Sequence, residues 1–531
     1  MRVMMLTPDT TIDRRILQEA ATLVDAWAEV LVVAMQTSDR RFPEHESLGE
    51  IKVQRFSFDG TDPRVLPWVP VRDTIARRLH AGVMRTQGVL EQVSIAVTTR
   101  IEQDDGSAEP TLARMGRRLE RIGQDVRRDL AGVLAGFRPT MQPITRVLLL
   151  PAQLNGLALI VTGRAVVWLG RLWPVKVGTF RAIRRVAASA CWGLGCLLPG
   201  FLRVFQLFLR LWSEASSRLT GLSAYEYALY RALRTYPYDA YHAHDLPMLK
   251  VTRRLARRWK AKLIYDAHEL YPEIITLTPH QRRRLARLER RYIQHADAVI
   301  TVNRFIAEEM SRRYAIPKPQ VILNCASLPA EEAAHARLFH ERLGLAPKRV
   351  VVLYQGWLAP HRGLEALVCS ARYIVPSVVI VLLGFGEYWS ELERLIAAEG
   401  VGDRVFLVPA VPQDELLRWT AAADVGIIPY QAVDTNTLYC SPNKLFEYIA
   451  AGVPVIANEL PFLREIVTNH RIGITHPLSA PESYGEAINH LAASEEERIE
   501  YRANVVRAAK IFNWDIEGKK LLEIYRGLNL R

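Results

Sequence analysis

The fold is indicated by Ser441-Pro-Asn-Lys-Leu-Phe-Glu-Tyr-Ile-Ala-Ala-Gly-Val-Pro-Val-Ile-Ala457. Pro442 suits the first turn of a helix, where its missing N–H costs nothing. Gly452 suits the left-handed position that ends a helix. A short apolar strand follows, from Val453 to Ala457. The stretch therefore predicts a helix and the strand after it in an α/β fold.

The start of this helix offers a site for an anion. The first turn of a helix has free backbone N–H groups and the positive end of the helix dipole, and here it also carries Lys444. A diphosphate is the most natural ligand, and Glu447, one turn further on, is placed to hold a ribose or sugar hydroxyl. The alternative is an ordinary buried helix–strand unit with two surface charges, and the stretch alone does not decide between them.

The stretch resembles the nucleotide-sugar half of GT-B glycosyltransferases, specifically the large retaining family 4. In that family a Glu-Ala- or Glu-Tyr-type helix followed by Ala-Gly-x-Pro-Val-Ile lies against the donor. The resemblance covers residues 1–60 and 222–531, and the stretch between them does not match. It implies an α/β protein of GT-B type, with two doubly wound Rossmann-like domains facing a cleft. It also implies a retaining hexosyltransferase that uses a nucleotide-diphosphate sugar.

The N-terminal segment has the rhythm of a doubly wound domain. An apolar strand at 2–7 is followed by a helix that starts at Asp13, a continuous apolar strand at 30–34 and a third strand at 51–56. The family's usual glycine-rich first loop is absent. The residues that match the family's opening are Asp13, Arg15, Ile16, Glu19 and Ala20.

Four segments are expected on this basis. The N-terminal Rossmann-like, acceptor-side domain comprises 1–64 and 220–335, and a helical, apolar and basic insertion occupies 65–219. The C-terminal Rossmann-like nucleotide-sugar domain comprises 336–511. Residues 512–531 resemble the family's last helix, which crosses back onto the first domain.

Composition points to anionic partners. The 531 residues carry a net charge of +13, which favours nucleotide diphosphates or an anionic lipid surface. Nucleic acid is not expected as a partner, because the sequence has no zinc-ligand spacing, RNP-type aromatic pattern or basic zipper. The five cysteines are scattered and odd in number, so a reducing cytoplasmic compartment fits. The first apolar run is too short for a signal peptide.

The insertion predicts contact with a membrane. Two runs of seventeen residues, 147–163 and 186–202, carry no charge, which is borderline for a span of about 20 residues. Between 201 and 212 the polar residues Arg203, Gln206 and Arg210 form one stripe, as in a helix that lies in the interface plane. We expect peripheral or monotopic attachment of 141–219 to an anionic membrane, at the cytoplasmic face of the cell membrane. One alternative is that the segment crosses the membrane twice, and the other is a helical pair buried against the protein or a partner chain.

Two cations are the main candidates for binding the donor diphosphate. The loop Gly356-Trp-Leu-Ala-Pro-His-Arg-Gly363 resembles the family's loop, in which a glycine–arginine pair is followed by Lys-Gly. Arg362 matches that lysine, and Trp357 replaces the family's arginine, a contact that His361 could supply instead. Arg362 and Lys444 are expected to stabilise the charge of the leaving diphosphate. The alternative is that Arg362 caps a loop on the surface.

Further donor contacts follow from the resemblance. Tyr439 stands where the family has the first of two glutamates, so its hydroxyl, or the side chains of Ser441 and Asn443, would replace that contact. A Gly-x-Gly turn at 384–386 and the segment 408–412 match the parts of the family near the nucleotide. The expected donor-binding residues are Gly356, Gly384, Gly386, Val411, Tyr439, Ser441 and Asn443.

In the first domain, His268 is the expected catalytic partner of Arg362, Lys444 and Glu447. It lies in Tyr265-Asp-Ala-His-Glu-Leu-Tyr271, which resembles the segment whose histidine faces the donor sugar. Ligands of open α/β sheets bind where parallel strands end. A lone histidine is more often structural, and the neighbouring histidines at 242 and 244 either line the acceptor site or support His268. The expected acceptor-side residues are Asp13, His244, Asp245 and Glu269.

These observations predict a glycosyltransferase that moves a sugar to a membrane-held acceptor, for which a lipid-linked glycan is the first choice. No metal and no cofactor are expected, because no two-carboxylate metal site stands out in the sequence. A nucleotide-sugar epimerase of the same fold is one alternative. The other is an inactive scaffold, in which Trp357 and Tyr439 mark lost catalysis.

Overall fold

The computed structural model describes residues 1–36, 41–56, 222–329 and 337–530, with four single positions at 117, 120, 121 and 124. The chain divides into two units, Met1–Met35 with Pro43–Arg55 and Tyr236–Arg531, and Gln36–Phe42 with Phe56–Thr235. Apart from the four single positions, the predicted insertion at 65–219 lies outside the described residues, as does the segment 141–219. Within the described ranges, none of the helices combines the length and apolarity that a membrane crossing requires.

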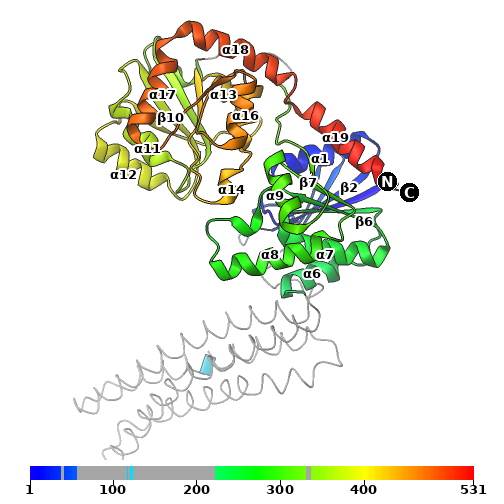
Figure 1. The fold of residues 1–531 in the computed structure, drawn as a ribbon. Coiled ribbons are helices and arrows are strands. Elements are labelled where there is room, and N and C mark those ends of the chain that lie inside the picture. Colours follow the sequence, from blue (N-terminus) through cyan, green and yellow to red (C-terminus); the bar gives the residue numbers. More distant parts are fainter. Residues whose placement is uncertain are drawn as a thin grey trace, which may run out of the picture. The chain divides into compact units, whose positions relative to one another are not determined.

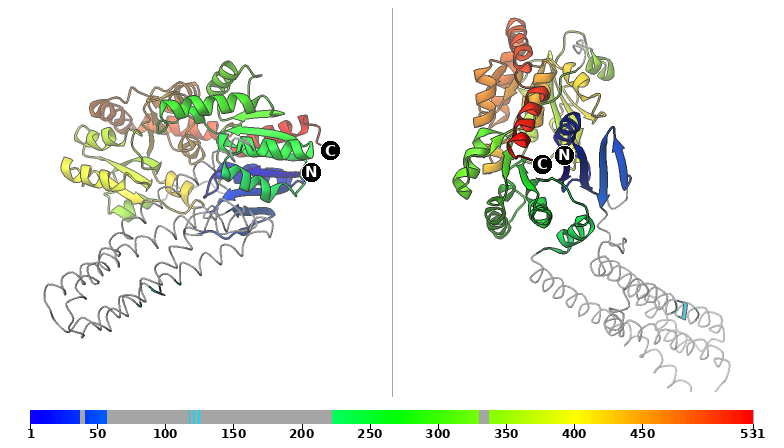
Figure 2. Two further views of the ribbon diagram at one scale, coloured as in Figure 1. Left: turned by 90° about the horizontal axis from the view of Figure 1, so that it is seen from below. Right: turned by 90° about the vertical axis from the view of Figure 1, so that its right-hand side faces the viewer.

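The first unit contains two sheets, of which the first is eight-stranded with the order β3-β4-β2-β1-β5-β6-β7-β8. Successive pairs from β2 through β1 to β8 are parallel, and β3 pairs antiparallel with β4. Its strands are β1 Arg2–Leu6, β2 Glu29–Met35, β3 His45–Leu48, β4 Ile51–Phe56, β5 Ala240–His244, β6 Lys262–Ala267, β7 Ala298–Thr301 and β8 Gln320–Val321. Figure 2 shows blue and green strands side by side, so this sheet joins segments that are far apart in the chain.

Several helices of the first sheet, though not α7 (Asp245–Trp259), begin at side-chain caps. The carboxylate of Asp13 caps α1 (Arg14–Asp25), and Asn303 caps α9 (Arg304–Tyr314). A capping box precedes α8 (Pro279–Ile293). The helix α7 packs on β5 and β6 and contacts α8, as Figure 1 shows. A short 3-10 turn, η2 (Tyr271–Glu273), follows β6. From the second unit, the structure describes α6 (Ala224–Leu233).

The second sheet has six parallel strands in the order β11-β10-β9-β12-β13-β14. Its strands are β9 Val350–Trp357, β10 Val378–Phe385, β11 Val405–Pro409, β12 Val425–Ile428, β13 Val455–Ala457 and β14 Gly473–Thr475. The helices of this part are α10 Leu338–Leu343, α11 Leu364–Cys369, α12 Trp389–Glu399, α13 Leu416–Ala421, α14 Thr435–Leu438, α15 Asn443–Ala450, α16 Pro461–Asn469, α17 Pro481–Ala493 and α18 Glu495–Ala509, with the 3-10 turn η3 Ser370–Arg372. The two α/β sheets confirm the predicted fold class.

The stretch that indicated the fold forms α15 and β13. Pro442 is the residue before α15 rather than a member of its first turn, and its φ of −71° leads the chain into the helix. Gly452 takes a φ of 74°, which a residue with a Cβ adopts only with strain. The strand begins at Val455, two residues later than expected. The helix, its end and the strand are otherwise as predicted.

The last helix, α19 (Trp514–Gly527), packs on α1. The indole N–H of Trp514 donates to Thr22 Oγ1 at 2.9 Å. The carboxylate of Glu517 accepts from the backbone N–H of Leu323 at 2.9 Å. Leu521 joins the hydrophobic core of the first sheet. The end of the chain therefore contributes to the core of the N-terminal domain.

Candidate functional site

Lys444, at the start of α15, is the centre of a cationic site on the second sheet. Its side chain is only 4% exposed. The ammonium Nζ lies 3.5 Å from the ring centroid of Tyr354 and 4.7 Å from that of Tyr430. It has no hydrogen-bond partner among the described residues. Two aromatic faces therefore hold this charge in place of a hydrogen-bonded acid.

Two glycines shape the backbone of the second sheet next to Lys444. Gly356 has a φ of +110°, and a Cβ built there would lie 3.9 Å from the Nζ of Lys444. Gly384 pairs with Gly356 across β9 and β10, and a Cβ on it would lie 1.9 Å from the carbonyl oxygen of Gly356. The two strands thus come close together here because Gly384 has no side chain.

Arg362 belongs to the same cluster. Its guanidinium carbon lies 4.3 Å from the ring centroid of Tyr430 and 5.9 Å from that of Trp357. Burial, together with the charge of Arg362, lowers the pKa of Lys444 well below its ordinary value. Ser441, just before α15, has a buried Oγ that also lacks a hydrogen-bond partner among the described residues. The cluster therefore offers two cations and an uncommitted hydroxyl.

The carboxylate of Glu447 joins the two sheets. Its Oε1 accepts from Arg14 Nη1 of α1 at 2.9 Å, and its Oε2 accepts from Gln355 Nε2 of β9 at 2.6 Å. Both oxygens are therefore engaged, and a ribose or sugar hydroxyl would have to share one of them. The predicted role of Glu447 in binding the donor stays a prediction.

The loop between α14 and α15 is tied to the ends of the first sheet. The carbonyl of Tyr439 accepts from Asn303 Nδ2 at 2.7 Å, and the carbonyl of Ser441 accepts from Asn324 Nδ2 at 3.3 Å. The ring of Tyr439 stacks on Phe305, with centroids 5.9 Å apart. Tyr439 thus makes a packing contact at the position where the family has a glutamate.

His268 follows β6, at the carboxyl end of the first sheet. Its backbone N–H donates to Asp245 Oδ1 at 3.0 Å, and its Nε2 lies 3.1 Å from Nδ1 of His244. Burial disfavours the charged imidazolium, but the carboxylates of Asp245 and Asp266 outweigh it and raise the pKa of His268 to about 10. Asp245 itself takes a φ of 60°, a strained value for a residue with a Cβ.

Three predicted acceptor-side residues, Asp245, His244 and Glu269, meet around His268. Glu269 Oε2 accepts from Asn436 Nδ2 at 2.8 Å, and the backbone N–H of Leu270 donates to Asn436 Oδ1. Burial raises the pKa of the Glu269 carboxyl, and the charges of His268 and Arg362 oppose that rise. The groups around His268 and around Lys444 are thus in electrostatic contact through Arg362.

The remaining predicted site residues are not among the side chains described above around Lys444 and His268. Asp13 caps α1, with its carboxylate accepting from the backbone N–H of Arg15 at 2.8 Å. Gly386 takes a φ of +152°, and a Cβ on it would lie 2.1 Å from the carbonyl oxygen of Leu358. Asn443 is the first residue of α15, and Val411 packs against the core of the second sheet. Their predicted contacts with a substrate stay predictions.

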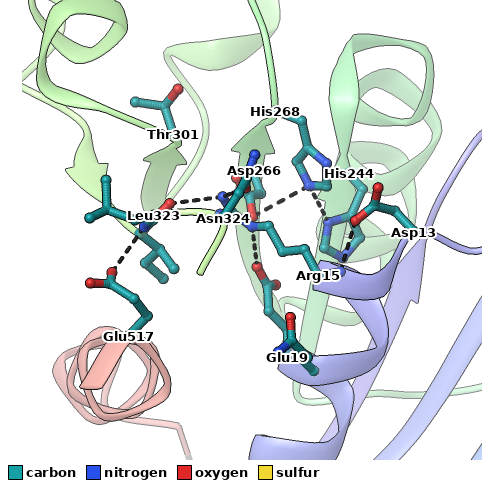
Figure 3. A network of polar contacts seen from close by, with 12 residues as sticks. Asp13, Arg15, Glu19, His244, Asp266, His268, Thr301, Leu323, Asn324 and Glu517 are labelled. Carbon is teal, nitrogen blue, oxygen red and sulfur yellow. Dashed lines mark hydrogen bonds and ion pairs between the residues drawn. The ribbon is translucent and has the colours of Figure 1, made fainter. Parts of the chain in front are cut away.

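A network of buried ion pairs lies next to His268 (Figure 3), and it was not predicted from the sequence. Arg15 is 2% exposed; its Nε donates to Glu19 Oε1 at 2.8 Å and its Nη2 to Asp266 Oδ2 at 2.7 Å. Its Nη1 donates to Asn324 Oδ1 and to the carbonyl of Ile322. The one signal was the spacing of Arg15 and Glu19, which places them on one face of a helix.

Two protein families match the chain, one after the other. The family described as "Glycosyl transferase 4-like domain" matches residues 160–325, and the family "Glycosyl transferases group 1" matches 336–511. The first match begins inside the segment that the sequence motifs left unmatched, so the resemblance extends further than those motifs indicated.

Individual relatives are similar over about half of the chain. The D-inositol 3-phosphate glycosyltransferase of Xylanimonas cellulosilytica is 27% identical over 311 residues, 54% of this chain and 72% of the relative. That of Acidothermus cellulolyticus is 28% identical over 319 residues, 54% of this chain and 67% of the relative. Among solved structures, sucrose-phosphate synthase from Thermosynechococcus elongatus aligns with a TM-score of 0.55 at 15% identity, over 99% of this chain and 98% of the other. This last likeness is one of fold.

Proposed function

Because this chain belongs to the GT-B glycosyltransferases, with a glycosyl transferase 4-like domain followed by a glycosyl transferases group 1 domain, we propose that it uses a nucleotide-diphosphate sugar. The sugar is transferred, with retention, to an acceptor held at the cytoplasmic face of a membrane. Both matched families are described as glycosyl transferases, which argues against the alternative that the protein is a nucleotide-sugar epimerase.

The unpaired ammonium of Lys444 is the observation that carries the donor proposal. A buried charge without a hydrogen-bonded counter-ion is costly, and a second cation nearby, Arg362, adds to that cost, whereas the carboxylate of Glu447 offsets part of it. A diphosphate would supply the missing negative charge to both. The hydroxyl of Ser441 and the start of α15 would add hydrogen-bond donors to the same group.

The two cations, Lys444 and Arg362, suit the departure of a diphosphate leaving group. As the bond between the anomeric carbon and the diphosphate breaks, negative charge grows on the leaving oxygen, and Lys444 and Arg362 would stabilise it. In a retaining transfer the acceptor hydroxyl approaches from the leaving-group face, so the diphosphate oxygen can take its proton. His268 would hold a hydroxyl of the donor sugar from the first sheet. These steps use side chains and a helix end in place of a metal ion.

The proposal that the acceptor is held at a membrane is based on the amino-acid sequence alone. Two uncharged runs of seventeen residues and the stripe of Arg203, Gln206 and Arg210 support attachment of 141–219 to an anionic membrane. A lipid-linked glycan would then remain at the surface where the enzyme is bound. The names of the curated relatives favour a second candidate, a small phosphorylated polyol such as inositol 3-phosphate.

One experiment separates the two acceptors. Purified full-length protein is mixed with labelled nucleotide sugars and either vesicles carrying lipid-linked glycans or soluble inositol 3-phosphate. Label that enters the lipid phase supports the proposal, and label found only on the polyol overturns it. Turnover with none of the donors would favour the inactive scaffold.

Attachment itself is tested by deletion. A variant lacking 140–219 should lose binding to anionic vesicles while keeping its affinity for the nucleotide sugar. Equal vesicle binding by that variant would show that the segment does not attach the enzyme.

A further inference from the structure

Four buried side chains of the first sheet and α1 lie close together near His268. Glu19 of α1, His242 and His244 of β5, and Asp266 of β6 each offer one ligand atom, and these atoms all lie within 4.8 Å of one another. All four side chains are completely buried. Figure 3 shows Glu19, His244 and Asp266 approaching one another from α1 and two neighbouring strands.

One polar atom of each side chain is held by a neighbour. Arg15 donates to Glu19 Oε1 at 2.8 Å and to Asp266 Oδ2 at 2.7 Å. The hydroxyl of Tyr525, on α19, lies 2.9 Å from His242 Nδ1. Nε2 of His268 lies 3.1 Å from His244 Nδ1. The orientation of all four side chains is therefore fixed from outside the cluster.

The other polar atom of each side chain has no hydrogen-bond partner among the described residues. These atoms are Glu19 Oε2, His242 Nε2, His244 Nε2 and Asp266 Oδ1. Glu19 Oε2 lies 4.0 Å from Nδ1 of His242, which is beyond hydrogen-bond distance. Buried polar atoms in folded proteins are nearly always paired. Each of these four neighbouring, fully buried side chains thus keeps one unpaired polar atom, which points to a ligand bound among the four residues.

We propose that Glu19, His242, His244 and Asp266 bind one divalent transition-metal ion of the Zn²⁺ or Mn²⁺ class. Imidazole nitrogen and carboxylate oxygen are ligands that these ions accept, whereas Mg²⁺ and Ca²⁺ prefer oxygen alone. Metal-bound histidines and carboxylates are typically oriented by hydrogen bonds from outside the ligand set.

The ion acts as a structural clamp. It joins α1, β5 and β6 at the carboxyl end of the first sheet, and through His244 it fixes the imidazole of His268. Tyr525 extends the same set of contacts to α19. The ligands are different residues from the cationic cluster of Lys444 and Arg362. The site thus departs from the predicted absence of a metal without giving the ion a part in sugar transfer.

Metal analysis of the full-length protein tests the proposal without any activity measurement. Protein purified without chelator and then desalted should contain about one equivalent of Zn²⁺ or Mn²⁺. Removal by EDTA should lower the melting temperature, and adding back Zn²⁺ or Mn²⁺ should restore it. Co²⁺ added to the EDTA-treated protein should give visible absorption stronger than that of the aquated ion.

Variants locate the ion. His242→Gln and Glu19→Gln should each hold less than about a tenth of an equivalent, because each removes one ligand. His280→Gln, on the exposed start of α8, should match the unmodified protein. If either ligand variant fails to fold, the Co²⁺ spectrum of the unmodified protein still shows whether a metal ion is bound by protein ligands.

Two results would overturn the proposal. One is that no metal co-purifies and neither Zn²⁺ nor Mn²⁺ stabilises the protein, which would make a water molecule the occupant. The other is that the folded ligand variants retain the metal, which would place the ion elsewhere.

Discussion

The ammonium of Lys444 lies 3.5 Å from the centre of the Tyr354 ring and has no hydrogen-bond partner among the described residues. An aromatic face attracts a cation but does not neutralise it. The charge is therefore held in place without a hydrogen-bonded acid, which suits a residue that must pair with an incoming anion. This relationship sets the expectations for variants of the donor site.

Replacing Lys444 by methionine should lower turnover by about two to three orders of magnitude, because one cation that stabilises the leaving diphosphate is removed. The same change should leave the melting temperature unchanged or raise it, since a buried charge without a hydrogen-bond partner disappears. Steady-state kinetics and calorimetry measure the two effects. Lys318→Met, at an exposed residue, is the control. A large loss of stability with normal turnover per folded molecule would contradict this expectation.

Arg362→Ala should reduce turnover by about two orders of magnitude or more, since Arg362 is the second cation of the cluster. Arg362→Lys should recover part of the loss, because it keeps the charge but not the planar guanidinium. Steady-state kinetics compares both with Arg394→Ala, at an exposed position of α12, as the matched control. Near-normal turnover of Arg362→Ala would rule out its proposed role.

Donor binding should weaken at alkaline pH. Burial and Arg362 lower the pKa of Lys444, so the free enzyme loses this charge at a lower pH than an ordinary lysine does. Affinity for a nucleoside diphosphate should be highest below the lowered pKa and fall as pH rises through it. In Lys444→Arg the fall should move to higher pH, because arginine stays charged. Titration calorimetry at several pH values checks both proteins, and identical profiles would refute the assignment.

The same lowered pKa gives the stability of the free enzyme the opposite dependence on pH. Between the folded pKa of Lys444 and its higher, ordinary value, the unfolded chain binds more protons than the folded chain. The free energy of unfolding should therefore rise with pH across this window, and Lys444→Met should lack that contribution. Chemical denaturation measures it, and an unchanged slope in the variant would count against the buried charge.

The contact between Arg14 and Glu447 should couple the two sheets. Their side chains are 19% and 11% exposed, and Nη1 lies 2.9 Å from Oε1. A double-mutant cycle with Arg14→Ala and Glu447→Gln should give a coupling of about 1 kcal/mol in the free energy of unfolding. The exposed pair Lys52 and Glu29 should give no measurable coupling. A zero result for the first pair would contradict the expected coupling.

Local chemistry made part of the site predictable. Pro442 and Gly452 flank a run of helix-forming residues and suit the two ends of a helix, so α15 and β13 followed from a single stretch. Arg362 follows β9 and Lys444 follows β12, and these two strands are neighbours in a parallel sheet. The proximity of Arg362 and Lys444 could therefore be predicted once the fold was known.

Contacts between residues far apart in the sequence were not predictable in the same way. Arg14 meets Glu447 across 433 positions of sequence, and Tyr525 meets His242 across 283. No spacing rule links such residues, since their meeting depends on the packing of whole elements. The match of Arg15 and Glu19 to the family's opening was visible, but the burial of Arg15 against an aspartate of β6 was not.

Binding of nucleoside diphosphates to the unmodified protein and to the double variant Lys444→Met with Arg362→Ala tests the central claim most directly. Titration calorimetry with UDP, GDP, ADP and TDP should show that the unmodified protein binds one or more of them. The folded double variant should bind roughly a hundredfold more weakly, a loss of about 2.7 kcal/mol. Equal affinity in both proteins, or no binding of any of the four by the unmodified protein, would contradict the account.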